Sequence, residues 1–139
     1  MSIQSPSQAG TGFPLSQLTG LIIGCAMKVH TRLGPGLLEN SYHACLAHEL
    51  VNAGLEVDSQ VALPLFYGDV QLDVGYRVDM IVSDLVVVEI KSVERVIPIH
   101  EAQLLTYLKL SNKEIGLILN FNVRKLTDGI TRKIMSRKN

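Results

Sequence analysis

The chain has no tryptophan, aromatic residues make up only 5% of it, and it has just two cysteines. Cys25 and Cys45 each stand alone among apolar residues in no zinc-type spacing, so we expect packed free thiols in a reducing cytoplasm. No apolar run reaches the roughly 18 residues of a membrane helix, and the amino terminus lacks the basic start of a secretory signal. We therefore expect a cytoplasmic protein that does not contact a membrane.

Net charge is also absent, because 13 Lys and Arg residues balance 13 Asp and Glu residues in the 139-residue chain. No long-range field therefore draws the whole molecule toward nucleic acid. One local basic excess lies near the carboxyl end, where a solvated tail is favoured over a nucleic-acid contact. It comprises Arg124, Lys125, Arg132, Lys133, Arg137 and Lys138. The length and apolar content indicate one domain, at 14–134. The Ser, Gly and Gln of residues 1–13 indicate a loose arm before it, and the basic residues at 135–139 a tail after it.

Hydrophobic spacing divides the chain into helices and strands. Apolar residues that recur every three or four positions predict helices, and alternating or continuous apolar runs predict strands. The predicted order is two helices, three strands, a helix and a strand, at 15–33, 38–53, 55–67, 70–82, 85–93, 99–110 and 114–123, followed by a short element of undetermined type at 128–135. We expect an antiparallel hairpin from the second and third strands, and an edge or irregularity at Pro64. This order predicts an α/β fold with a mixed sheet.

The two amino-terminal helices are each expected to bury one apolar stripe. The predicted inward residues are Leu18, Ile22, Cys25, Val29 and Leu33 in the first helix, and Leu38, Tyr42, Cys45, Leu46, Leu50 and Ala53 in the second.

Three charged residues interrupt strands that are otherwise apolar. Glu89 and Lys91 in "LVVVEIKSVE" are two apart and share a face, and Asp79 interrupts "YRVDMIV" in the preceding strand. Each carboxylate needs a partner, because burying an unpaired one costs several kcal/mol. A two-residue turn would place Asp79 on the other face, whereas a three-residue turn or a bulge around Ser83 pairs it with Glu89. We predict the odd or bulged connection.

Two explanations account for such a carboxylate pair. Neighbouring carboxylates raise each other's proton affinity unless a cation lies between them. Lys91 could supply that cation in a structural ion-pair network. A divalent metal is the alternative, because hard oxygen ligands suit Mg²⁺ or Mn²⁺. These three residues alone favour neither explanation.

Further candidates are weaker when each is taken alone. Glu39 falls in the first turn of the second helix, where the helix dipole favours a carboxylate, and Tyr42 shares its face but is also an ordinary core aromatic. Gln103 and Tyr107 are four apart on the third helix, with His100 one turn earlier. A glutamine beside leucines is usually a boundary residue.

Taken together, these positions resemble the GxxExxY protein family of the PD-(D/E)XK nuclease superfamily. Gly36, Glu39 and Tyr42 in "GLLENSY" match the Gly-x-x-Glu-x-x-Tyr signature. The segments "RVDMIV", "VVVEIKSVE", "HEAQLLTYLKL" and "GLILNFNV" are similar to later blocks of that family, so the likeness runs from about Leu18 to about Arg132. It implies a restriction-endonuclease-like αβββαβ core with a central mixed sheet flanked by helices, in agreement with the order predicted from periodicity.

The resemblance also implies a role for each residue. Asp79, Glu89 and the backbone carbonyl of Ile90 would bind the metal, and Glu39 would complete the site directly or through water. Lys91 would be the lysine of the E-x-K element, positioning water or neutralising charge on the phosphate. The remaining matches are Gln103 and Tyr107, which fit the Q-x-x-x-Y motif of RecB-like exonucleases, and Gly36, Tyr42 and His100 in supporting positions.

The implied function is hydrolysis of DNA phosphodiester bonds by a Mg²⁺- or Mn²⁺-dependent nuclease. The alternative is a catalytically silent module of the same fold that binds nucleic acid or a protein partner, which the neutral charge favours. A small-molecule metalloenzyme is a third interpretation, disfavoured because no glycine-rich phosphate loop is present. The sequence contains neither a helicase region nor the cysteines of an iron–sulfur cluster, which argues against processive exonuclease action. Members of the superfamily often work as dimers, so a homodimer is among the expected forms of this protein.

Overall fold

The structure is a computed structural model that describes residues 14–135. Its elements are α2 (Leu15–Leu33), α3 (Glu39–Asn52), β1 (Val57–Tyr67), β2 (Val70–Val82), β3 (Val86–Lys91), α4 (Pro98–Ser111), β4 (Ile115–Asn120), the 3₁₀ helix η1 (Leu126–Gly129) and β5 (Ile130–Ile134). The predicted arm at 1–13 and residues 136–139 of the predicted tail lie outside the described residues.

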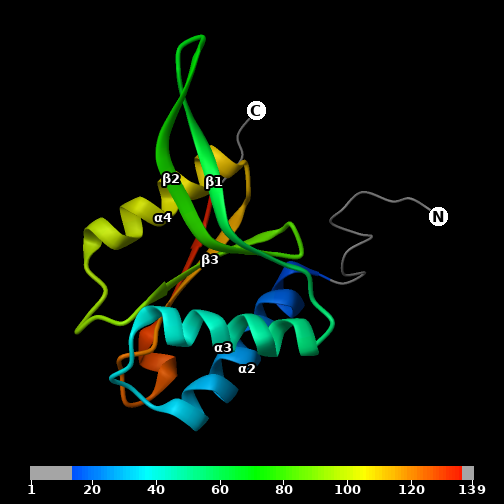
Figure 1. Cartoon of the computed structure of the whole chain (residues 1–139), viewed down its shortest axis with the longest axis vertical. Coiled ribbons are helices and arrows are strands. Elements are labelled where there is room, and N and C mark those ends of the chain that lie inside the picture. The colour runs from blue at the N-terminus through cyan, green and yellow to red at the C-terminus, as the bar shows by residue number, and fades with distance from the viewer. Residues whose placement is uncertain (1–13, 136–139) are drawn as a thin grey trace, which may run out of the picture.

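The strands form one five-stranded sheet in the order β1-β2-β3-β4-β5. Only β3 and β4 run parallel, and the other neighbouring pairs are antiparallel. Helices α2 and α3 cover one face of this sheet and α4 covers the other (Figure 1). The prediction of an α/β fold with a mixed sheet flanked by helices is confirmed. None of the helices between residues 14 and 135 is long and apolar enough to span a bilayer.

Alternation along β3 assigns its side chains to the two faces of the sheet. Val86, Val88 and Ile90 pack in the core beneath α2 and α3, and Val87 packs in the core beneath α4. All residues of β3 except the last are buried, as expected of a strand covered on both faces. Glu89 has the parity of Val87 and therefore belongs to the α4 face.

Strands β1 and β2 extend beyond the rest of the sheet as a two-stranded arm (Figure 1). A turn at Gly68 and Asp69 closes the arm. Strand β1 is an edge strand, and its register with β2 shifts between Leu63 and Leu65, on either side of Pro64. This confirms the edge irregularity expected there, because proline cannot donate to a ladder.

Three residues predicted to face the core are exposed, with exposed fractions of 37% for Leu33 and 77% for Leu38, and Ala53 exposed as well. Leu38 is the N-cap of α3 with extended backbone (φ −74°, ψ 152°), so its side chain does not follow the helical stripe. Ala53 is the C-cap, and Leu33 is the last residue of α2. The stripe predictions fail at the helix ends, where helical geometry stops.

The carboxyl-terminal basic residues are not all in a solvated tail, which corrects that interpretation. Residues 130–134 form β5, paired with β4. Lys133 forms an ion pair with Glu101 (Nζ to Oε1, 2.7 Å), and the Arg132 guanidinium donates to Thr19 Oγ1 (3.4 Å). Cys25 and Cys45 are free, half-buried thiols, as predicted.

Candidate active site

The connection between β2 and β3 sets the position of Asp79 relative to Glu89. The paired residues are Met80–Val88, Ile81–Val87 and Val82–Val86. Three residues, 83–85, therefore form the connection, which confirms the predicted odd register. One step further out, the same register places Asp79 opposite Glu89.

At this step the two strands separate, and side chains replace the ladder. The Asp79 amide N–H donates to Glu89 Oε2 (2.8 Å), and the Ile90 amide N–H donates to Asp79 Oδ2 (2.7 Å). Each carboxylate thus accepts a hydrogen bond from the backbone of the opposite strand. Only one oxygen of each carboxylate accepts one of these two bonds. Asp79 Oδ1 and Glu89 Oε1 take no part in them.

Glu89 lies in an environment that disfavours its charge. Its exposed fraction is 7%. Burial is the largest cause that raises the pKa of Glu89 to about 8, and the charge of Asp79 raises that pKa further. The Asp79 amide and the charge of Lys91 act in the opposite direction, and Glu39 adds a smaller increase. A cation bound at this position would lower the pKa again, because it favours the ionised form.

Lys91 is the last residue of β3 and pairs with Asn120 across the parallel ladder. It is half-buried and has the parity of Glu89. Within residues 14–135 the ion pairs are Lys28–Glu49, Lys113–Asp84 and Lys133–Glu101, and Lys91 is in none of them. Backbone amides, rather than Lys91, are therefore the direct partners of the two carboxylates.

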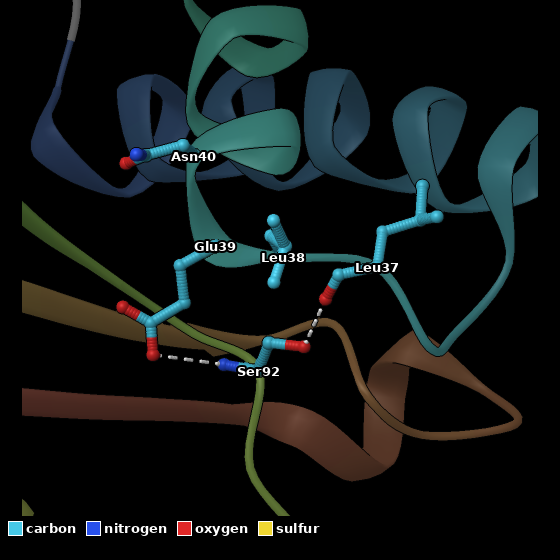
Figure 2. A pocket seen from close by; sticks show the side chains of 5 residues that line it. All are labelled: Leu37, Leu38, Glu39, Asn40 and Ser92. Atoms are coloured by element: carbon cyan, nitrogen blue, oxygen red, sulfur yellow. Dashed lines mark hydrogen bonds between the residues drawn. The ribbon is translucent and has the colours of Figure 1, made fainter.

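Glu39 is exposed at the amino-terminal end of α3 and reaches the end of β3 (Figure 2). Its Oε2 accepts a hydrogen bond from the Ser92 amide (3.3 Å), and Ser92 Oγ donates to the Leu37 carbonyl (2.6 Å). A cleft of about 440 Å³ opens here, lined by Leu37, Leu38, Glu39, Asn40 and Ser92.

Tyr42 explains the spacing of Gly-x-x-Glu-x-x-Tyr in physical terms. Its hydroxyl donates to the Gly34 carbonyl (2.6 Å) and accepts from the Leu37 amide (3.1 Å), so it fastens the loop that precedes α3. Gly36 lies in that loop with a φ of +99°, a conformation that favours glycine. The buried Tyr42 ring stacks on Phe121, with centroids 4.5 Å apart and planes 9° apart. Gly36 and Tyr42 thus hold the turn from which Glu39 projects.

The α4 residues of the predicted site differ in their surroundings. Tyr107 is buried and packs edge-on against Tyr76, with ring centroids 6.3 Å apart. Burial, followed by the charges of Glu89 and Asp79, raises the pKa of Tyr107, which places its hydroxyl within the field of the carboxylate pair. Gln103, one turn earlier, is exposed.

His100 has a local role at the start of α4. Its Nδ1 accepts a hydrogen bond from the Ile97 amide (3.1 Å) just before the helix, which satisfies one amide at the helix end.

Two residues next to the site were not among those predicted from the sequence. Ser92 is one, and Asn120 is the other: it is 1% exposed, its Oδ1 accepts from the Val93 amide (3.1 Å), and its Nδ2 donates to the Val93 carbonyl (3.0 Å). A polar residue closing the apolar run of "GLILN" is the same signal that singled out Glu89 and could have identified Asn120. Nothing in the sequence marks Ser92.

The oxygen atoms at the end of β3 suit a hard divalent cation. Asp79 and Glu89 lie side by side, and each has a carboxylate oxygen outside their mutual bonds. Two carboxylates and a backbone carbonyl, with water in the remaining positions, are a donor set typical of Mg²⁺. Among residues 14–135, no three His, Cys, Asp or Glu side chains gather as a metal-binding group, so Glu39 does not form one with this pair. Metal binding by Glu39, directly or through water, stays a prediction.

A mixed sheet flanked by helices, with an acidic pair and a lysine at the end of a central strand, defines the architecture of a nuclease-like α/β protein. The sequence matches the profile of the PD-(D/E)XK nuclease superfamily over residues 16–133, and the chain belongs to that superfamily. Searches of curated proteins and of solved structures found no match.

Proposed function

We propose that this protein is a Mg²⁺-dependent nuclease that hydrolyses phosphodiester bonds of DNA, and that within the superfamily it belongs to the GxxExxY group. The observation that carries the proposal is the Asp79–Glu89 pair, in which two facing carboxylates are held by backbone amides beside Lys91. Ion-pair networks also perturb pKa values, but here Lys91 forms none of the ion pairs described above. An acidic pair that is costly to bury and has no ion pair with a Lys, Arg or His side chain of residues 14–135 is consistent with a site that takes up a cation.

Each residue would have its own role in such a site. Asp79, Glu89 and the carbonyl of Ile90 would hold the ion, with Glu39 reached through water. When bound, the ion would polarise the phosphoryl group and acidify water for attack on phosphorus. Lys91, on the same side of β3 as Glu89, would donate to the phosphate and offset its growing negative charge. Tyr107, whose pKa the charges of Glu89 and Asp79 raise, would help to orient the substrate.

The test is cleavage of labelled single- and double-stranded DNA by the purified protein, with Mg²⁺, with Mn²⁺ and with chelator. Lys91→Ala should lose at least about 100-fold in rate, the scale for removing a charge-stabilising donor, and should still bind Mn²⁺. Asp79→Asn and Glu89→Gln should lose both cleavage and Mn²⁺ binding. Equal cleavage by the wild type and Lys91→Ala would reject the nuclease function.

A silent module that binds nucleic acid or a protein partner is the second candidate, favoured by the charge distribution. Residues 57–76, which span most of the arm, contain Asp58, Asp69 and Asp73 and no Lys or Arg. Most DNA enzymes present a basic surface to phosphates. DNA binding without cleavage at any Mg²⁺ or Mn²⁺ concentration would support this candidate over the nuclease.

A further inference from the structure

Ser92 joins two parts of the candidate site that are far apart in the sequence. It directly follows Lys91, the last residue of β3, and contacts the segment that leads into α3. Its amide donates to Glu39 Oε2 (3.3 Å) and its hydroxyl donates to the Leu37 carbonyl (2.6 Å), as Figure 2 shows. A single residue therefore contacts both the helix acid and the loop that carries it.

The β3 side of this contact is firmly anchored. The Phe121 amide donates to the Lys91 carbonyl (3.0 Å), and Asn120 exchanges two hydrogen bonds with Val93. The residues before and after Ser92 are thus each bonded to the end of β4. Because Asn120 is buried, these bonds are shielded from competition by water.

The α3 side is anchored by the Tyr42 hydroxyl, which bonds to both Gly34 and Leu37. Glu39 itself is exposed, and a glutamate side chain at a surface has several accessible rotamers. Ser92 connects the anchored end of β3 to the anchored α3 loop, because it bonds directly to Glu39 and to Leu37. Without its hydroxyl, the loop that carries Glu39 would lose its bond from Ser92 to the Leu37 carbonyl, and the 3.3 Å contact between the Ser92 amide and the Glu39 carboxylate would have to position Glu39 without that support.

We propose that Ser92 is a positioning residue that holds the α3 amino terminus against β3, so that the Glu39 carboxylate is presented to the Asp79–Glu89 pair. This role rests on the proposed function, because it matters only if Glu39 contributes to binding a cation. Ser92 itself touches neither the cation nor the substrate; it acts through Glu39.

The experiment compares Ser92→Ala with Ser92→Thr, which keeps the hydroxyl at a position that lines the open cleft. Ser111→Ala is the matched control, because the Ser111 hydroxyl also donates to a backbone carbonyl, that of Leu108 (3.4 Å), at the far end of α4. Two readouts need no catalysis: Mn²⁺ affinity measured by electron paramagnetic resonance, and amide hydrogen exchange at Leu37.

Ser92→Ala should weaken Mn²⁺ binding about fivefold, the scale of one hydrogen bond, and should speed exchange of the Leu37 amide. Ser92→Thr should restore both values, and Ser111→Ala should change neither. In a Glu39→Gln background, Ser92→Ala should have no further effect on Mn²⁺ affinity, because the carboxylate through which it acts is gone.

Three different results would count against the proposal, and the measurements distinguish them from one another. An unchanged Mn²⁺ affinity in Ser92→Ala would reject the role of Ser92 alone. An equal loss with and without Glu39→Gln would show a general structural effect and would also reject it. A wild type that binds no Mn²⁺ would overturn the proposed metal-dependent function together with this role, whatever the exchange at Leu37.

Discussion

Asp79 and Glu89 face each other where β2 separates from β3. The Asp79 amide donates a hydrogen bond to the Glu89 carboxylate, and the Ile90 amide donates one to the Asp79 carboxylate. The arrangement brings two negative charges together in a largely buried place. Backbone amides compensate each carboxylate in part, but a dipole does not neutralise a charge. A proton or a cation can complete the compensation, and the first prediction concerns the proton.

The protein without metal should lose stability as the pH rises through the range in which folded Glu89 keeps its proton. Burial and Asp79 raise the pKa of Glu89 from 4.5 to about 8, whereas the unfolded chain releases that proton near 4.5. Between these values the folded state holds more protons, so the free energy of unfolding falls with rising pH. The loss should be on the order of a few kcal/mol by pH 8, measured by urea unfolding in chelator.

Glu89→Gln is the control for this dependence, because glutamine keeps an oxygen acceptor for the Asp79 amide and does not titrate. The difference in unfolding free energy between this variant and the wild type should grow in favour of the variant from pH 5 to pH 8. A constant difference across that range would show that Glu89 does not titrate as described.

The register of this pair could be predicted from the sequence because the cost of burial leaves little choice. Residues of a strand alternate between two faces, and an even connection would have separated Asp79 from Glu89. The same logic did not extend to Leu38, where the backbone is no longer helical. Periodicity describes the interior of an element and says little about its ends.

The contacts around Glu39 show why other parts of the site could not be predicted. Ser92 and Leu37 meet across 55 positions of the chain, and their bond joins a hydroxyl to a backbone carbonyl. No residue pattern encodes such a bond, because every residue has a carbonyl. Asn120, in contrast, carries a signal in its burial among apolar residues, and that signal is visible in the sequence.

Tyr42→Phe should destabilise the protein by about 1–3 kcal/mol, the typical net value of two lost hydrogen bonds. The change removes the bonds to Gly34 and Leu37 and keeps the stacking on Phe121. Tyr42→Leu also loses the stack and should cost more. Urea unfolding measures both variants.

Tyr67→Phe is the matched control for Tyr42→Phe, because Tyr67 is 78% exposed near the tip of the arm. It should stay within about 0.5 kcal/mol of the wild type, as is usual for surface substitutions. An equal effect at both tyrosines would show that the Tyr42 hydroxyl does not fasten the loop.

Gly129→Ala should destabilise the protein by about 1–3 kcal/mol, the usual range for overpacking. A Cβ at Gly129 would collide with the backbone carbonyl oxygen of Asn120, so either η1 or the end of β4 must move. The matched substitution Gly20→Ala should have the opposite sign, because Gly20 lies in α2 with nothing within 4 Å of the added carbon. Alanine there gains about 1 kcal/mol of helix propensity. Urea unfolding that gave both variants the same sign would contradict the close approach of η1 to β4.

Mg²⁺ should stabilise the folded protein at pH 8, close to the pKa of about 8 at which Glu89 loses its proton. A ligand that binds only the folded state adds about 2.7 kcal/mol at 100 times its dissociation constant, so the melting temperature should rise with Mg²⁺ concentration. Lys91→Ala should show the same rise, since Lys91 is not expected to bind the ion. Asp79→Asn and Glu89→Gln should show little or none. Scanning calorimetry separates these cases without any substrate, and a rise of the same size in all four proteins would place the ion elsewhere and count against a metal site at the Asp79–Glu89 pair.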